Sequence, residues 1–224
     1  MITDPVHNHC NIPVSEPGDR ELDELLVRNA AWAASKTSND PTFFHRLVEQ
    51  QRPRYFWIGC SDSRVPATEI VDLDPGEMFV HRNVANLALE HDPSFAAALQ
   101  FAVETLEVSH IMVVGHYGCG GIQAALEDKP EQDDPVARWI EPIRGLRSQA
   151  VETAENSEDR AARLCEANVL SQVDRVIQNS VVRQAWDKGR NLTVSGYVYR
   201  IEDGLLKAIA LKRNAVSGES AFSA

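Results

Sequence analysis

Residues 55–64 of the chain read Tyr-Phe-Trp-Ile-Gly-Cys-Ser-Asp-Ser-Arg. The short apolar run at 55–58, closed by a glycine, is typical of a buried strand. Chemically reactive side chains follow it directly, at Cys60, Asp62 and Arg64. In open α/β sheets, ligands bind beyond the carboxyl ends of the strands. This stretch therefore predicts a buried strand with a functional loop at its end.

The neighbouring sequence repeats this pattern and predicts a parallel sheet. Apolar runs at 77–81 and 111–114 predict two further strands, and a helix over 94–107 lies between them. Strands that are apolar on both faces and joined through helices form parallel sheets with right-handed crossovers. Further predicted elements are helices at 20–36, 40–50, 120–126, 136–154 and 159–186 and strands at 191–199 and 205–211.

These elements predict one α/β domain over residues 20–212, with a central, mostly parallel sheet flanked by helices and an N-terminal helical arm. Residues 1–19 lack any periodicity and are expected to be a flexible arm, and 213–224 a frayed tail. The chain has 224 residues, of which 43% are hydrophobic and 25% charged, a composition that suits one soluble globular domain.

Charge and hydropathy exclude several classes of partner. A net charge of −11 disfavours nucleic acid and anionic membrane surfaces. No apolar run approaches the ~20 residues of a membrane span, and the N-terminus has no signal-peptide pattern, so we expect a cytoplasmic protein. In a reducing compartment the four cysteines are expected to be metal ligands or buried thiols rather than disulfides.

Two segments together predict a metal site. Cys60 follows the first strand, and His116 and Cys119 follow the third, with the spacing His-x-x-Cys. Two thiolates and one imidazole match catalytic zinc sites, which keep an open fourth position. Taken alone, each of these residues is better explained as a buried or structural side chain, and only their conjunction favours a metal.

Asp62 and Arg64 extend this candidate site. In extended backbone the side chains of Cys60 and Asp62 point the same way, so Asp62 can reach the metal or a water bound to it. Arg64 could hold Asp62 by a bidentate contact, although a plain surface pair remains the alternative. Gly118, Gly120 and Gly121 permit a tight turn that could cradle an anion, but the lysine of a phosphate-binding loop is missing.

The motif 60–64 together with His-Tyr-Gly-Cys-Gly-Gly at 116–121 resembles the β-class carbonic anhydrases, and residues 79–86 resemble the segment that this family carries between the two. The likeness runs from about residue 22 to 211. It implies reversible hydration of carbon dioxide to bicarbonate and a proton, through a hydroxide on Zn2+. It implies Cys60, His116 and Cys119 as zinc ligands, Asp62 and Arg64 as a catalytic dyad, a substrate pocket near Gln51, Phe79, Val84 and Gly120, and a homodimer or homotetramer.

Within that family, the chain resembles a bacterial subgroup with an inactive state. There the counterpart of Asp62 leaves its arginine and becomes the fourth zinc ligand. The resemblance implies an allosteric bicarbonate site at Trp57, Arg82 and Tyr199, although Trp57 and Tyr199 could equally be core aromatics. Many relatives have tyrosine where this chain has Phe101, to which we assign no role.

The ligand charges predict an alkaline enzyme. Zinc lowers the pKa of its water from ~15.7 to ~7, and two thiolates should make that lowering smaller. Two alternatives to carbon dioxide hydration stay open: a related zinc hydrolase acting on carbonyl sulfide or carbon disulfide, and a non-catalytic zinc- or bicarbonate-binding module.

Overall fold

The computed structural model describes residues 20–127, 134–148 and 154–212. The predicted flexible arm (1–19) and frayed tail (213–224) lie outside these ranges. The chain divides into two units, residues 1–50 and 51–224. The first contains helices α1 (Arg20–Asn39) and α2 (Phe43–Glu49), where Trp32 and Phe44 meet edge to face at 5.7 Å.

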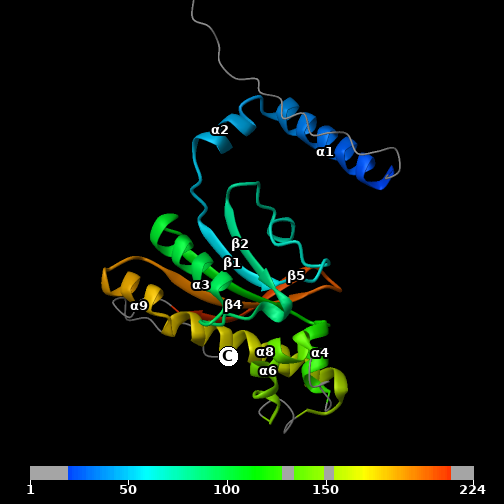
Figure 1. Cartoon of the computed structure of the whole chain (residues 1–224), viewed down its shortest axis with the longest axis vertical. Coiled ribbons are helices and arrows are strands. Elements are labelled where there is room, and N and C mark those ends of the chain that lie inside the picture. Colours follow the sequence, from blue (N-terminus) through cyan, green and yellow to red (C-terminus); the bar gives the residue numbers. More distant parts are fainter. Residues whose placement is uncertain (1–19, 128–133, 149–153, 213–224) are drawn as a thin grey trace, which may run out of the picture. The chain divides into compact units, whose positions relative to one another are not determined.

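The second unit is built on a five-stranded sheet in the order β2-β1-β3-β4-β5 (Figure 1). All neighbouring strands are parallel except β4 and β5, which confirms the predicted mostly parallel sheet. The chain leaves β1 for the edge strand β2 and then crosses back to β3, so the direction of winding switches between β1 and β3. The strands are β1 (Tyr55–Cys60), β2 (Met78–Asn83), β3 (His110–His116), β4 (Thr193–Arg200) and β5 (Leu205–Lys212).

The two faces of the sheet are covered differently. Phe56 and Ile58 belong to the main core, which includes buried side chains of α3 and α8. Trp57, which alternates with them along β1, lies in a smaller cluster with Val65 of the connection between β1 and β2. The helices are α3 (Pro93–Gln100), α4 (Gly120–Leu126), α5 (Pro135–Trp139), α6 (Glu141–Arg144), α8 (Ser157–Gln178) and α9 (Ser180–Asp187), with 3-10 turns at Glu69–Val71 and Val84–Asn86.

Three predicted helices differ in detail. The helix predicted over 159–186 is broken at Asn179, whose extended backbone ends α8 and whose side chain accepts the N–H of Val181 to begin α9. The helix predicted over 94–107 is α-helical only to residue 100 and continues as a π-helical turn, Phe101–Thr105. In place of the start of the helix predicted over 136–154, the structure has two short helices, α5 and α6. They are separate because Pro142, in the first turn of α6, has no N–H to donate to the preceding turn.

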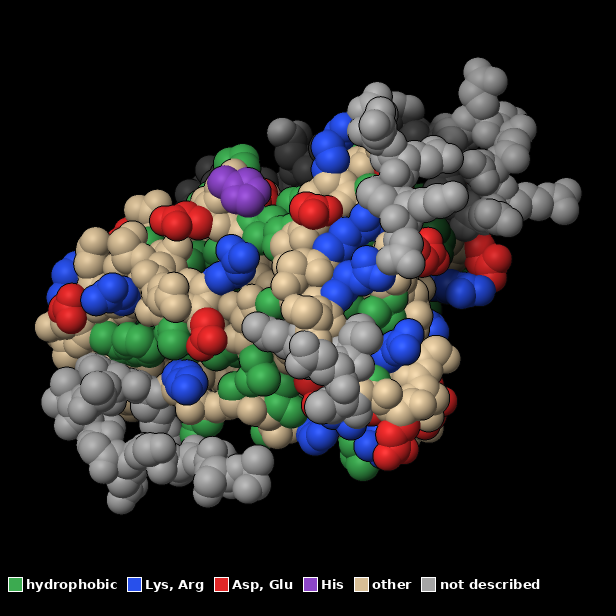
Figure 2. Space-filling model, turned by 90° about the horizontal axis from the view of Figure 1, so that it is seen from below, with side chains coloured by type: hydrophobic (Ala, Val, Ile, Leu, Met, Phe, Trp, Pro, Cys, Tyr) green, Lys and Arg blue, Asp and Glu red, His purple; other side chains and the backbone are tan. Residues whose placement is uncertain are grey.

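No helix in the described part of the chain is both long and apolar enough to cross a membrane. On the face shown in Figure 2, acidic and basic side chains both occur across the surface, with apolar side chains between them. This distribution agrees with acidity that is spread along the sequence rather than gathered in one run.

Candidate metal centre

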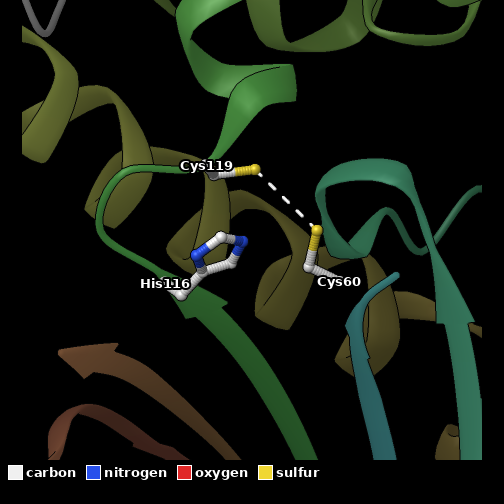
Figure 3. A group of neighbouring side chains, drawn as sticks. All are labelled: Cys60, His116 and Cys119. Atoms are coloured by element: carbon white, nitrogen blue, oxygen red, sulfur yellow. Dashed lines mark hydrogen bonds between the residues drawn. The ribbon is translucent and has the colours of Figure 1, made fainter. Parts of the chain in front are cut away.

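Three buried side chains converge where β1 and β3 end. Cys60 is the last residue of β1, His116 is the last residue of β3, and Cys119 precedes α4. Their donor atoms all lie within 4.8 Å of one another, and Figure 3 shows the side chains gathered around one space. The two sulfur atoms are 3.9 Å apart. Two Zn–S bonds of about 2.3 Å in tetrahedral geometry place the sulfurs about 3.8 Å apart, so the spacing fits zinc.

His116 presents one nitrogen to this space. Its Nδ1 lies 3.1 Å from the carbonyl oxygen of Tyr117, a contact that assigns the proton to Nδ1. Nε2 is buried and has no hydrogen-bond partner among the described residues. A buried polar atom without a partner is costly. A metal ion bonded to Nε2 would satisfy it, and the Nδ1 contact is of the kind that orients histidine ligands.

The two thiols cannot both ionise easily by themselves. The hydrogen bond from Cys119 lowers the pKa of Cys60, and backbone N–H groups of the surrounding loops lower it further. The pKa of Cys119 is raised, because its thiol donates the hydrogen bond to Cys60 and because it is buried beside that sulfur. Two thiolates at this distance repel each other, whereas a divalent cation between them would let both ionise. The donor set therefore suits a metal.

Asp62 lies at the rim of the three donors and is held by Arg64. The guanidinium donates twice, from Nε to Oδ1 at 3.0 Å and from Nη2 to Oδ2 at 2.7 Å. These bonds keep the pKa of the Asp62 carboxyl well below its usual range. Arg64 Nη2 also lies 3.3 Å from the carbonyl oxygen of Gly118, and Asp62 Oδ2 lies 3.7 Å from His116 Nε2. The predicted pair is thus anchored to the loop that carries the third donor.

A cleft of about 440 Å³ opens beside this pair, lined by Arg64, Tyr117 and Gly118 together with Arg200 and Glu202. The three metal donors do not line this cleft. The cleft therefore gives solvent access to Arg64 rather than to the metal donors themselves.

The three residues of the predicted bicarbonate site occupy two kinds of environment. Trp57 and Tyr199 are buried in the same small cluster, and Trp57 Nε1 has no hydrogen-bond partner within the described ranges. Arg82 instead donates to two backbone carbonyls, that of Cys60 at 2.8 Å and that of Asp62 at 2.6 Å. Arg82 therefore holds the loop that carries the first metal donor.

The predicted substrate residues are only partly brought together. Phe79 packs between Phe56 and Phe101, with ring centroids 5.6 and 5.8 Å away. Val84, which is 39% exposed, lies against the start of α4, where Gly120 is the first residue. Gln51 is an exposed residue that precedes β1.

The sequence analysis missed the contribution of α8. Cys165 Sγ donates to the carbonyl oxygen of His116 at 3.2 Å, and Glu166 accepts a 2.6 Å hydrogen bond from Tyr117. Asn168 and Gln172 are buried polar residues in the same helix. Their spacing of four places both within the apolar stripe of α8, a pattern that could have marked them as buried and bonded.

Comparison with known proteins identifies the family. The family model described as carbonic anhydrase matches residues 55–206. The Coccomyxa β-carbonic anhydrase structure in complex with acetazolamide superimposes with a TM-score of 0.83 and 34% identity, covering 88% of this chain and 90% of that one. This chain belongs to the β-carbonic anhydrase family.

Other family members align over most of their length. A carbonic anhydrase of Emericella nidulans is 44% identical over 204 residues, covering 86% of this chain and 89% of that protein. A tetrameric β-carbonic anhydrase of Sordaria macrospora has a TM-score of 0.81 and 34% identity, covering 85% of this chain and 98% of that one. The matched region of this β-carbonic anhydrase contains all three metal donors and the Asp62–Arg64 pair.

Proposed function

We propose that this β-carbonic anhydrase hydrates carbon dioxide reversibly to bicarbonate and a proton, with Zn2+ held by Cys60, His116 and Cys119. One observation carries the proposal: three buried donors converge beside a carboxylate that a bidentate arginine holds. A purely structural zinc site needs no such pair, which argues against a non-catalytic zinc module.

When bound, zinc would lower the pKa of a water at its fourth position and so supply the nucleophile. Asp62, ionised because Arg64 bonds both of its oxygens, can only accept hydrogen bonds. We propose that it accepts one from this nucleophile and so directs the reacting lone pair at carbon dioxide. Phe79, Val84 and Gly120 would bound an apolar pocket for the substrate, and Gln51 would donate to a substrate oxygen.

We also propose that Asp62 can compete for the fourth metal position, as in the bacterial subgroup described above. If Asp62 left Arg64, it could become the fourth metal ligand. No position would then remain for water, and the enzyme would be inactive. Bicarbonate near Trp57, Arg82 and Tyr199 would favour that state only by binding it more tightly than the open one. Arg82 supports the idea, because an anion that attracts its guanidinium would compete with the carbonyls of Cys60 and Asp62. Unchanged bicarbonate inhibition in Arg82→Ala would count against it.

The test is stopped-flow carbon dioxide hydration from about pH 6 to pH 9, with metal analysis of the same protein. We expect bound zinc and activity that rises toward alkaline pH, because two thiolates weaken the acidification of water. Full activity already reached below neutral pH would contradict the charge argument. Zinc without hydration at any pH would refute the proposed reaction, and parallel assays with carbonyl sulfide and carbon disulfide would test the alternative hydrolase.

A further inference from the structure

The 3-10 turn Val84–Asn86 borders two parts of the metal centre. On one side, the carbonyl oxygen of Asn83, the residue before the turn, accepts the backbone N–H of Ser61, next to Cys60, at 2.9 Å, and Ala85 is buried in the same core cluster as Cys60. On its other side the turn packs so closely on α4 that a Cβ added to Gly121 would lie 3.0 Å from Ala85 Cβ and 3.1 Å from Val84 Cγ1. A shift of this turn would therefore disturb both the residue that follows Cys60 and the helix that follows Cys119.

The conformation of Ala85 in this turn is one that an alanine does not favour. Ala85 has φ 64° and Asn86 has φ 51°, so two consecutive residues other than glycine adopt the left-handed region. Contacts of Cβ with the backbone disfavour this region in L-residues, and it persists only where the surroundings hold it. Contacts from elsewhere in the fold must therefore stabilise the turn.

Helix α8 supplies these contacts through a chain of three hydrogen bonds. Asn168 Nδ2 donates to the carbonyl oxygen of Ala85 at 2.9 Å, and Gln172 Nε2 donates to Asn168 Oδ1 at 2.9 Å. Gln172 Oε1 then accepts the backbone N–H of Ala88 at 3.0 Å. Both amide side chains are 1% exposed. This series of hydrogen bonds therefore begins and ends on the backbone of the segment that contains the left-handed turn.

Other side chains close the turn but leave the Ala85 carbonyl to α8. Asn83 bonds both the N–H and the carbonyl oxygen of Leu87, and Trp139 Nε1 donates to the carbonyl oxygen of Val84 at 2.8 Å. Asn168 is therefore the side chain that holds Ala85, the residue of the turn that packs against α4.

We infer that Asn168 and Gln172 are positioning residues of the metal centre. They hold residues 85–88 so that the left-handed turn stays packed between the residue after Cys60 and the start of α4, which follows Cys119. The inference rests on the proposed zinc site. Removing contacts that support metal ligands from outside the ligand set commonly changes metal affinity or activity by about 10–100-fold.

The test uses the full-length, zinc-loaded protein and measures the rate of zinc release to an excess of chelator. Asn168→Leu removes both bonds of Asn168 at similar side-chain size, and we expect release about 10–100-fold faster. Gln172→Met leaves the bond to Ala85 and should give a smaller acceleration. The double variant should release zinc no faster than Asn168→Leu, because the two amides act as one chain.

Val176→Ala is the matched control, since Val176 is a buried residue of the same helix and has an apolar side chain. It should lower the melting temperature without changing zinc release. The cobalt(II)-substituted variants give a second readout, because a displaced Cys60 thiolate changes the thiolate-to-cobalt absorption band.

The inference would be overturned if Asn168→Leu and Gln172→Met released zinc at the rate of the control, even if both variants were less stable. If Asn168→Leu does not fold, the comparison of zinc release from Gln172→Met with that from Val176→Ala tests the inference by itself. A wild-type protein that binds no zinc would refute the proposed function itself, which is a different result from unchanged release by a zinc-loaded protein.

Discussion

At the scale of single residues, the Asp62 carboxylate has both oxygens bonded to Arg64 at the edge of the metal donors. Replacing it by an amide keeps the shape but removes the negative charge. We expect Asp62→Asn to retain zinc, because the three donors are intact, and to lose about 10–100-fold in kcat/KM for hydration. Stopped-flow assays and metal analysis of one preparation measure both quantities.

Asp203→Asn is the matched control, because Asp203 forms an exposed pair with Arg200 at 3.0 Å. Exposed pairs of this kind contribute about 0–1 kcal/mol, so this variant should keep its activity. Equal activity of the two variants would show that Asp62 has no special role.

The cysteines give a second prediction at this scale. Cys60→Ser should lose most of its zinc on dialysis, because a serine hydroxyl does not ionise at neutral pH and replaces a thiolate ligand. Cys165→Ser should keep its zinc, since burial raises the pKa of the Cys165 thiol to about 12 and this group donates to the carbonyl oxygen of His116. Metal analysis after dialysis compares them, and zinc retained by Cys60→Ser would contradict the ligand assignment.

At the scale of elements, α8 lies very close to the end of β3. A Cβ added to Gly115 would lie 2.6 Å from Val169 Cγ2. We therefore expect Gly115→Ala to lower the free energy of unfolding by about 1–3 kcal/mol, the usual cost of overpacking a core. Chemical denaturation measures the change.

Gly145→Ala is the control, because its nearest neighbour would lie at an ordinary 3.6 Å. Its backbone is already helical, with φ −61°, so this variant should be neutral or slightly stabilising. An equal loss of stability in both variants would contradict the claim that close packing on Val169 makes Gly115→Ala destabilising.

The elements also show what the sequence could predict. The apolar runs predicted the strands because a buried parallel strand is apolar on both faces, and β1 ends at Cys60 beside the predicted loop. The sequence could place Cys60, His116 and Cys119 at the ends of two strands. Their convergence required β1 and β3 to be neighbours, which the structure shows.

Other features depend on tertiary contacts and could not be predicted in this way. The left-handed conformation of Ala85 has no local signal, because alanine disfavours this region, whereas Asn86 is a residue type that tolerates it. Asn168 reaches Ala85 only through the packing of α8 on the sheet. The break at Asn179 did have a local signal, an asparagine that can cap a helix, but the apolar periodicity continued across it.

At the scale of the whole molecule, the edge strand β2 leads to a prediction about assembly. Val80 in β2 and Val84 after it are each 39% exposed, and Phe101 is 42% exposed. Unpaired strand edges with apolar side chains are surfaces on which chains associate. We expect a homodimer or homotetramer by light scattering, and smaller particles for Val80→Lys.

Val136→Lys is the control, since Val136 is 45% exposed on α5. It introduces the same charge at a comparably exposed valine and should leave the particle mass unchanged. A wild-type monomer, or the same mass for Val80→Lys and wild type, would contradict assembly through β2.

The order of the supporting side chains along the chain has a consequence for synthesis on the ribosome. All three donors are made by residue 119, whereas the residues that support them come later, in α8: Cys165 bonds the carbonyl oxygen of His116, and Asn168 and Gln172 hold residues 85–88. A nascent chain therefore exposes a complete donor set before it can retain an ion there. We expect zinc in a chain stopped at residue 148 to exchange rapidly with a radioactive tracer, and zinc in the finished protein to exchange slowly. Incorporation of the metal would then become irreversible on the timescale of translation only when α8 docks.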